Sequence, residues 1–534
     1  MIEDPVAIGL KSGWQVTDAS TQKEDLTIEA DAVIIGSGAG GGMAAEVLTQ
    51  AGFSVVIVEE GPLKSSQDFK MKESEAYPEL YQESAARKTA DKAINILQGR
   101  CVGGGTTVNW TSSFSTPEPT LRYWAEQFGV KASLPEDMHP WFKRVQERLN
   151  ITEWHIPPNA NNALLGKGIE ALGYSFNIMH RNVKNCANLG YCGVGCPVNA
   201  KQSMLVTTIP QALSAGATLL TRARAERLLF SGDEVTQVEI AALDSRGVRP
   251  TGKTITIRSK QIVMSGGAIG TPALLLRSNA PDPYRLVGKR TFLHPVNVVA
   301  CIMPERVDGF AGAPQTIYSD AFLWPEGATG KMGYKLEVPP LHPLLVSTVI
   351  DSFGPAHRLL MQQLPYLQAI LALHRDGFHP ESEGGTVKLR EDRSPFLDYP
   401  ISDYVWEAMR RSFLTMSEIQ FAAGARQVLP LHRAFDKPFN SWRETQAALK
   451  KVTLEPLAAR LFSAHVMGGC NFGENPETSM VNSLGQHHHL KNVTVLDGSV
   501  FPTSIGSNPQ VSIYAFSMRN ALALAQRMGT SVSS

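Results

Sequence analysis

The sequence has no excess of charge of either sign. Its 534 residues hold 50 Lys and Arg against 50 Asp and Glu, so the formal net charge at neutral pH is zero. Nucleic-acid-binding domains are typically basic, and electrostatic attachment to a membrane needs clustered Lys and Arg. The balance therefore argues against a nucleic-acid partner and against direct electrostatic attachment to a membrane.

Long apolar runs are also missing. No stretch approaches the roughly 18 uninterrupted apolar residues that a membrane-spanning helix needs, and acidic residues stand where a signal peptide would be apolar. Six cysteines are too few for a disulfide scaffold in a chain of this length. These absences predict a cytoplasmic protein without a transmembrane segment, which would reach a membrane only through a partner.

A strand, a glycine-rich turn, a helix and a second strand follow a lead-in over residues 1–28. Ala32–Ile35 is a short apolar run, residues 36–41 are rich in glycine, and Met43–Gln50 is helical in character. Val55–Val58 is a second apolar run. This order within about 30 residues is typical of the βαβ unit that binds a dinucleotide.

The glycine spacing in that turn is GxGxxG. Gly36 permits a tight turn, Gly38 lets the backbone approach a pyrophosphate, and Gly41 lets helix and strand pack closely. Ala39 lies in the same turn and is a further candidate contact, and the N-terminus of the helix that follows offers free N–H groups to a phosphate. Glu59 ends the second strand, near the spacing expected for an acid that binds a ribose hydroxyl. The alternative is a purely structural turn in an α/β sheet.

Two later apolar runs predict further strands of the same sheet, at Gln261–Met264 and Val493–Leu496. The domain they form is therefore discontinuous in sequence. Between them, Gly385–Leu389 alternates as strands do, and Arg358–His374 reads as a long apolar helix kinked at Pro365.

Three further segments carry a family resemblance: Gly99–Asn109, Ser265–Pro272 and Leu496–Thr503. Their sequences and order resemble the flavin-contacting signatures of the glucose–methanol–choline (GMC) oxidoreductases. The resemblance implies FAD and a discontinuous Rossmann-like FAD domain, interleaved with an α+β substrate domain on an antiparallel sheet. The implied FAD domain covers residues 25–115, 205–292 and 455–534, and the implied substrate or cap domain covers 116–204 and 293–454. Its further implied FAD contacts are Gly103, Gly104, Thr106, Asn109, Asp497, Gly498 and Pro509; for Asp497 an Asx-turn is the alternative.

The same resemblance assigns the reacting centre. His465 matches the catalytic histidine of the family, and Asn508 falls where members carry a second histidine or an asparagine. Alcohol oxidation needs a base for the hydroxyl proton while hydride leaves carbon for the flavin, and histidine suits that task. We expect His465 to be the base and Asn508 to hold the substrate oxygen. His294 also matches a recurring position, with an expected structural role.

Two other features carry weaker signals. Cys470 is expected to be a small buried hydrophobe rather than a nucleophile. His487–His489 cannot all face one metal ion from an extended segment, so a surface loop is expected there.

Cys186, Cys192 and Cys196 form a C-x5-C-x3-C-P pattern with intervening glycines. The spacing resembles the segment that holds a three-iron [3Fe-4S] cluster in bacterial FAD sugar dehydrogenases of the family. A zinc site lacks an obvious fourth ligand, and a loop of free thiols is the remaining alternative. These alternatives stay open at the level of sequence.

The expected partner is a small-molecule alcohol substrate. Ala200–Ser203 resembles long-chain alcohol oxidases of the family, and the stretch from Leu341 to Leu371 is rich in apolar residues, which favours a hydrophobic alcohol over a sugar or polyol. A flavin lyase or photodecarboxylase on the same fold is a further alternative. Electrons would pass to an external acceptor, which would be a quinone, a cytochrome or O2.

Overall fold

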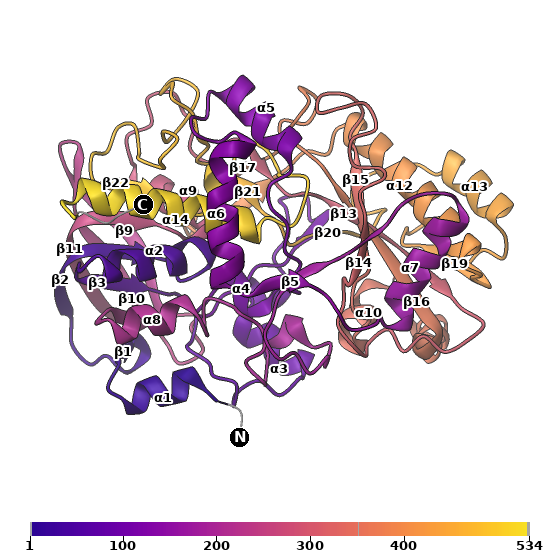
Figure 1. Cartoon of the computed structure of the whole chain (residues 1–534), viewed down its shortest axis with the longest axis horizontal. Helices are drawn as coiled ribbons and strands as arrows, with labels where there is room; N and C mark the ends of the chain where they lie inside the picture. Colours follow the sequence, from indigo (N-terminus) through magenta and orange to yellow (C-terminus); the bar gives the residue numbers. More distant parts are fainter. Residues whose placement is uncertain (1–2, 351, 531–534) are drawn as a thin grey trace.

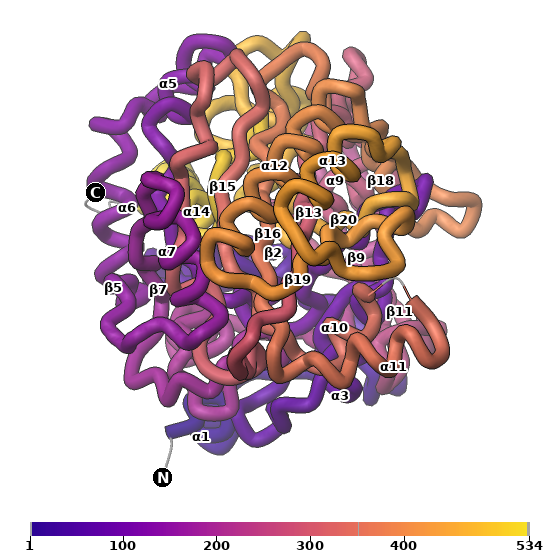
Figure 2. Tube along the Cα trace, turned by 90° about the vertical axis from the view of Figure 1, so that its right-hand side faces the viewer, coloured from indigo at the N-terminus to yellow at the C-terminus, as the bar shows by residue number. Residues whose placement is uncertain are grey.

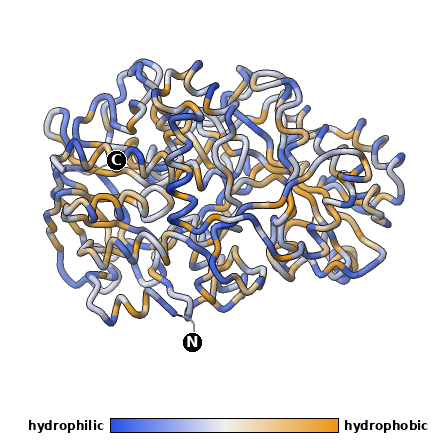
Figure 3. The backbone as a smooth tube through the Cα atoms, in the orientation of Figure 1, coloured by the Kyte–Doolittle hydropathy of each residue, from blue (hydrophilic) through white to orange (hydrophobic). Residues whose placement is uncertain are grey.

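Two eight-stranded sheets, each with its own hydrophobic core, organise the chain (Figure 1). The computed structural model describes residues 3–350 and 352–530. The first sheet lies in the left half of Figure 1 and the second in the right half. Hydrophobic segments run through the inner strands of both halves in Figure 3. The predicted α/β class is confirmed.

The first sheet has the order β1-β8-β3-β2-β11-β10-β9, with β22 paired to β11. Five neighbouring pairs are parallel: β1 with β8, β8 with β3, β3 with β2, β2 with β11, and β11 with β22. Two pairs are antiparallel: β11 with β10, and β10 with β9. Its strands are β1 Gln15–Asp18, β2 Leu26–Ile35, β3 Val55–Val58, β8 Thr218–Thr221, β9 Ala223–Ser231, β10 Glu234–Leu243, β11 Pro250–Met264 and β22 Val493–Val495. The predicted strands at 32–35, 55–58, 261–264 and 493–496 are confirmed within one residue at their C-terminal ends.

Helices cover this sheet. The predicted helix is α2, and the buried C-terminal helix α14 packs against both α2 and α6. Of the predicted lead-in over residues 1–28, the described part from residue 3 onward is more than a lead-in, because it forms α1 and the edge strand β1 and begins β2. The helices are α1 Pro5–Lys11, α2 Ala39–Gln50, α6 Pro135–Arg148, α8 Thr208–Ser214, α9 Gly267–Ser278 and α14 Gln510–Arg527.

The second sheet has the order β4-β20-β13-β16-β15-β14-β6, with β19 paired to β13. It is antiparallel except for the parallel pair of β20 and β4. Its strands are β4 Ile94–Ile96, β6 Asn177–Ile178, β13 Val296–Ile302, β14 Ile317–Ser319, β15 Tyr334–Glu337, β16 Leu367–His374, β19 Gln427–Pro430 and β20 Leu461–Ser463.

The predicted helix over 358–374 is wrong. Helix α11 ends at Gln362, and Leu367–His374 is strand β16, buried along its whole length between β13 and β15. A continuous apolar run fits a buried helix or a central strand equally well by pattern alone. Pro365 marks the break between the two elements rather than a kink within one helix.

The two faces of the second sheet have different neighbours. Helix α12, Asp403–Ala422, packs on β13, β16 and β19 with a buried face. The short helices α10, Pro343–Val349, and α11, Gly354–Gln362, lie at the edge of the molecule close to α3, Glu73–Leu80 (Figure 2). The remaining elements include α4 Gly105–Val108, α5 Glu118–Phe128, α7 Ala160–Ala171, α13 Trp442–Lys451, β5 Ile151–Glu153, β7 His180–Asn182, β12 Thr291–Phe292, β17 Thr386–Leu389, β18 Pro395–Asp398 and β21 Met467–Gly468.

Within residues 3–350 and 352–530, no helix combines the length and the apolar character that crossing a membrane requires. The proposed domain limits stay a prediction. Residues 531–534 of the segment 455–534, and residue 351 of the segment 293–454, lie outside the described part of the chain.

Candidate active site

One cavity of about 770 Å³ joins the two halves of the molecule. Twelve of the predicted site residues line it: Gly36, Gly38, Ala39, Glu59, Gly104, Thr106, Asn109, His465, Asp497, Gly498, Asn508 and Pro509. Gly41 and Gly103 are not among the lining residues. Residues that are distant in sequence are thus brought to one site by the fold.

The glycine-rich turn leaves room for a ligand but none for side chains of its own. Gly36 has a φ of +102°, and a Cβ there would lie 2.2 Å from the Ser265 carbonyl oxygen. A Cβ on Gly40 would lie 1.6 Å from the Leu496 oxygen, and one on Gly41 would lie 1.9 Å from the Gly36 oxygen. Helix α2 begins here without a side-chain cap on its N-terminus, which suits a phosphate.

Gly38 differs from its neighbours. A Cβ on Gly38 would meet no atom of the chain closer than 3.8 Å, the Cα of Gly104. Gly104 itself has a φ of +52°, and its own Cβ would lie 2.8 Å from the Cα of Gly38. The two glycine loops therefore touch at this point, and both line the cavity beside it, where the backbone leaves room for the pyrophosphate of FAD.

Glu59 is buried at the end of β3 and holds the turn in shape. It accepts hydrogen bonds from the Ser37 hydroxyl at 2.6 Å, the Ser37 amide at 3.1 Å and the Gly61 amide at 2.9 Å. Burial raises the pKa of this carboxyl. A carboxylate has about four acceptor positions, so one remains for a ribose hydroxyl.

Asp497 is bonded within the protein. Its carboxylate accepts hydrogen bonds from the Gly267 amide at 2.8 Å, the Thr271 hydroxyl at 2.6 Å and the Ser499 amide at 2.8 Å. It thereby joins the N-terminus of α9 to the C-terminal loop, and its bond to the Ser499 amide, two residues on, is that of the Asx-turn alternative. A direct contact of Asp497 with FAD stays a prediction.

The loop predicted to contact the flavin, Gly99–Asn109, is held by hydrogen bonds to the glycine-rich turn and within itself. The Gly103 amide donates to the Ser37 hydroxyl at 3.0 Å, and the Thr106 hydroxyl donates to the Gly103 oxygen at 2.6 Å. The side chain of Asn109 donates to Gln510 at 2.7 Å. Gln510, at the start of α14, was not identified from the sequence.

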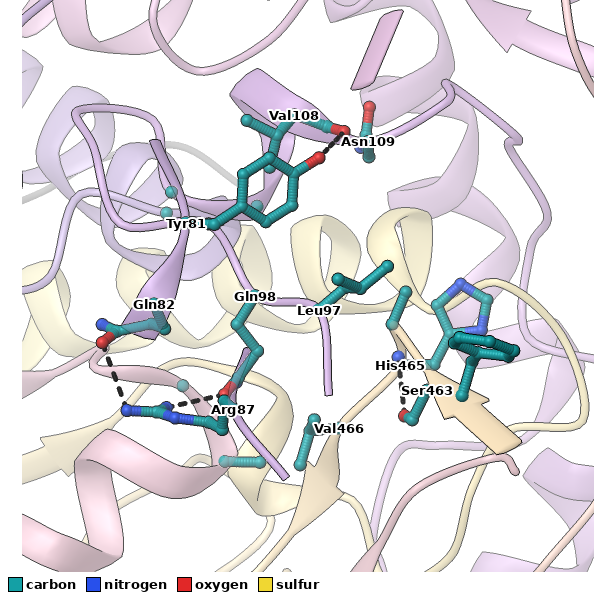
Figure 4. Close-up of a pocket in the computed structure, with 18 of the residues that line it drawn as sticks. Tyr81, Gln82, Arg87, Leu97, Gln98, Val108, Asn109, Ser463, His465 and Val466 are labelled. Atoms are coloured by element: carbon teal, nitrogen blue, oxygen red, sulfur yellow. Dashed lines mark hydrogen bonds between the residues drawn. The ribbon is translucent and has the colours of Figure 1, made fainter. Parts of the chain in front are cut away.

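Figure 4 shows a second wall of the cavity that the sequence did not indicate. The Tyr81 hydroxyl donates to the Gly193 oxygen at 2.6 Å and lies 3.4 Å from the Val108 oxygen. Arg87 donates to Gln98 at 2.9 Å and to Gln82 at 3.2 Å. Tyr81, Gln82 and Arg87 come from the segment between α3 and β4, and Gln98 follows β4; together they make one end of the site polar.

His465 follows β20 and lines the cavity (Figure 4). Its amide lies 3.3 Å from the Ser463 hydroxyl oxygen, and its Nδ1 lies 3.1 Å from Nδ1 of His294. Burial lowers the pKa of His465 to about 4, so the ring is neutral at pH 7 and can accept a proton.

Asn508 faces the cavity from the loop before α14 and contacts a buried acid. Its Nδ2 donates to Oε2 of Glu337 at 3.3 Å, and Gln315 donates to the same oxygen at 2.5 Å. Glu337 was not predicted from the sequence. The sequence did offer one indication of it: Lys335 and Glu337 are charged residues two positions apart, alternating with Tyr334 and Leu336.

Burial raises the pKa of Glu337 to about 7 from its ordinary value of 4.5. The fold therefore favours the protonated acid, whose contribution to stability is complete below pH 4.5 and is lost as the pH rises through 7. We expect Glu337→Gln, which cannot ionise, to gain stability relative to the wild type between pH 5 and pH 8, by up to about 3 kcal/mol. Thermal midpoints of both proteins with saturating FAD at the two pH values measure this, and parallel curves would contradict it.

The far part of the cavity is apolar. Along β13 and β16, the cross-strand pairs Val296–Leu373, Val298–Leu371, Ala300–Ala369 and Ile302–Leu367 all line it. Seven residues of β13 span roughly 20 Å. Leu345 and Val346 of α10 and Leu360 of α11 close the distal end. The smallest pair, Ala300 with Ala369, lies partway along this floor.

The three clustered cysteines lie outside the cavity lining. Buried Lys201 donates to the oxygens of Thr107 at 2.6 Å, Asn109 at 2.9 Å and Cys192 at 2.7 Å, so the cysteine loop is tied to the flavin-contacting loop. In the part of the chain that the structure describes, no group of three or more His, Cys, Asp or Glu side chains is arranged to hold a metal ion. Cys186, Cys192 and Cys196 form no disulfide.

Two smaller predictions have different outcomes. Cys470 is buried in the first core, as expected of a small hydrophobe. The prediction of a surface loop at 487–489 is wrong for His487, which is buried because its backbone pairs with Val481 and its amide donates to the Val493 oxygen.

Comparison with known proteins gives consistent matches. Residues 77–296 and 380–517 match the N-terminal and C-terminal models of GMC oxidoreductase. The long-chain-alcohol oxidase FAO4A of Arabidopsis thaliana is 28% identical over 510 residues, covering 91% of this chain and 67% of that protein. The uncharacterized GMC-type oxidoreductase y4nJ of Sinorhizobium fredii is 28% identical over 505 residues, covering 93% and 95%.

Solved structures agree on the fold. A structure concerned with FAD modification in formate oxidase from Aspergillus oryzae superposes with a TM-score of 0.69 at 14% identity, covering 95% of this chain and 99% of that one. At that level of identity the likeness concerns the fold alone.

Proposed function

The chain belongs to the GMC oxidoreductase family of FAD-dependent enzymes, and from this premise we propose that it oxidises the CH–OH group of a hydrophobic alcohol to the aldehyde or ketone. The observation that carries the proposal is the continuity of one cavity from the glycine-rich turn, past His465 and Asn508, to the apolar floor on β13 and β16. Electrons leave to an external acceptor.

Bound FAD supplies the hydride acceptor for this reaction. The chain's own residues supply the rest. Nε2 of His465 takes the hydroxyl proton, and the second amide hydrogen of Asn508 is available for the substrate oxygen while the first bonds Glu337. The glycine loops, Glu59 and the uncapped N-terminus of α2 would hold FAD.

The substrate class rests on the lining of the distal cavity. Four cross-strand pairs of alanine, valine, isoleucine and leucine, closed by α10 and α11, offer no partner for the hydroxyl groups of a sugar. The similarity to long-chain-alcohol oxidases supports the same class. An extended aliphatic chain fits a floor of roughly 20 Å.

Substrate-dependent bleaching of the flavin in the dark, with anaerobic protein and a panel of alcohols, tests the function. We expect bleaching that becomes faster with chain length. Bleaching by sugars or polyols alone would favour that alternative substrate class. Turnover without bleaching, or only under light, would favour a lyase or a photodecarboxylase.

Blocking the apolar floor should separate long alcohols from short ones. We expect Ala369→Phe to lower kcat/KM for long-chain alcohols by about 10-fold or more, while kcat/KM for short alcohols changes little. The reason is that the large side chain would fill the part of the cavity that Ala300 and Ala369 line. Ala369→Val is the matched control and should show a smaller loss in the same order. An equal loss for all chain lengths would contradict the assignment of this floor to the substrate.

An iron–sulfur cluster at Cys186, Cys192 and Cys196 stays a separate hypothesis. Lys201 joins the cysteine loop to the loop that is predicted to contact the flavin. This link supports a cluster that relays electrons from the reduced flavin to the external acceptor. The described residues offer no assembled metal-binding group, which supports free thiols instead. Iron and sulfide assays on anaerobically purified protein decide between the two.

A further inference from the structure

His294 lies directly behind His465 and outside the lining of the cavity. The two Nδ1 atoms are 3.1 Å apart, and the ring centroids are 5.3 Å apart. The His294 backbone is held in place: its amide donates to Asp376 at 3.1 Å, the amide of Leu293 donates to the same carboxylate at 3.0 Å, and its φ is +49°. His294 is therefore a rigid neighbour of the proposed base.

Both rings are neutral at pH 7. Burial lowers the pKa of His465 to about 4. Burial, followed by repulsion from His465, His374, Lys335 and Arg375, places the pKa of His294 well below its ordinary value. Two neutral imidazoles that meet through Nδ1 share a single proton there, so one ring donates and the other accepts.

The direction of that hydrogen bond decides what His465 can do. If His294 donates, His465 carries its own proton on Nε2 and has no free nitrogen toward the cavity. If His465 donates, its Nε2 has a free lone pair. Once Nε2 has taken a proton, both nitrogens of His465 are protonated, and Nδ1 can only donate. The protonated ring therefore needs an acceptor at the position of His294.

We propose that His294 is a positioning residue that accepts the Nδ1 proton of His465 and so keeps Nε2 of His465 free to take the hydroxyl proton of the alcohol. This inference rests on the proposed function. The O–H bond of the alcohol breaks, the Nε2–H bond of His465 forms, and the proton on Nδ1 stays in place. In this arrangement His294 carries its own proton on Nε2.

Two observations agree with this role. Nε2 of His294 is buried without a hydrogen-bond partner, which costs stability and is unusual for a residue with a purely structural role. The cations of Lys335 and Arg375 act on His294 and disfavour its protonated form. A neutral His294 remains an acceptor at the moment when His465 becomes positively charged.

Substitutions at His294 test the proposal. His294→Leu fills the space without an acceptor, whereas the Oδ1 atom of His294→Asn stands near the place of Nδ1, and asparagine tolerates a positive φ. We expect the Leu variant to lose about 10-fold or more in kcat with KM nearly unchanged, and the Asn variant to recover most of that loss. Should the Leu variant not retain FAD, His294→Gln replaces it, because its amide reaches past the position of Nδ1.

A double variant separates positioning from a general loss of structure. We expect His294→Leu with His465→Ala to be no slower than His465→Ala alone, because His294 acts only through His465. The readout is the rate of anaerobic flavin bleaching, per bound FAD, in the intact holoenzyme. Three results would overturn the inference while His465 remains the proposed base. They are a double variant whose rate loss equals the product of the two single losses, an Asn variant as slow as the Leu variant, and a Leu variant with the kcat of the wild type. Wild-type bleaching in His465→Ala would instead remove His465 as the base, and a wild-type protein that no alcohol bleaches would overturn the proposed function.

Discussion

His465→Ala is expected to lose about 100-fold or more in kcat while retaining FAD. A positioned acid–base group contributes about 10²- to 10⁴-fold, and His465 is the neutral imidazole that lines the cavity between the glycine loops and the apolar floor. The loss should fall on kcat and kcat/KM alike, because the proton is transferred only in the reacting step. Stopped-flow bleaching of the flavin measures the step directly.

His487→Ala is the matched control for this experiment. His487 is also buried, with a pKa that burial lowers to about 4, but it does not line the cavity. Its substitution should leave turnover per bound FAD near that of the wild type. His465→Gln adds a variant that keeps the size of the side chain and has no base. Turnover retained by His465→Ala with FAD bound would remove His465 from the chemistry.

Gly40→Ala is expected to produce protein that does not hold FAD. The added Cβ would lie 1.6 Å from the Leu496 oxygen and 3.0 Å from the Ser517 hydroxyl, so α2 would have to move away from the end of β22 and from α14. Overpacking of this kind costs about 1–3 kcal/mol or more. It also displaces the helix N-terminus that would bind the pyrophosphate. Flavin absorbance per protein and the thermal midpoint measure both effects.

Gly38→Ala separates the ligand from the fold. Its Cβ would meet nothing of the chain closer than 3.8 Å, so the apo protein should keep the wild-type thermal midpoint. We expect FAD affinity to fall by about 10-fold or more, because the same Cβ points into the space that a pyrophosphate needs. Unchanged FAD affinity in this variant would contradict the position assigned to the cofactor.

Local patterns predicted four strands of the first sheet, β2, β3, the end of β11, and β22, but not β1, β8, β9 or β10. The run Ala32–Ile35, the glycine turn, α2 and the run Val55–Val58 are contiguous, and their period and turn chemistry are read within about 30 residues. The same kind of pattern gave a wrong prediction for Arg358–His374, because a continuous apolar run does not distinguish a buried helix from a central strand. Only the pairing of β16 with β13 and β15 decides that question.

The residues of the candidate site likewise fall into those that the sequence identified and those that only the structure revealed. His465, Asn508 and the glycine loops were identified because family signatures carry them in short segments. The partners of the two reacting residues were not: Glu337 is separated from Asn508 by 171 positions, and His294 from His465 by 171. No local pattern links residues so far apart, because each contact depends on how the two sheets pack.

By itself, the amino-acid sequence determined the family, the flavin-binding elements and the identity of the proposed base, because these depend on residue types at short spacings. The tertiary structure alone decided which buried groups face that base and its asparagine, how far the apolar floor extends, and which glycines have no room for a side chain. These properties arise from contacts between distant segments, and burial by those contacts is what alters the pKa values of His465, His294 and Glu337.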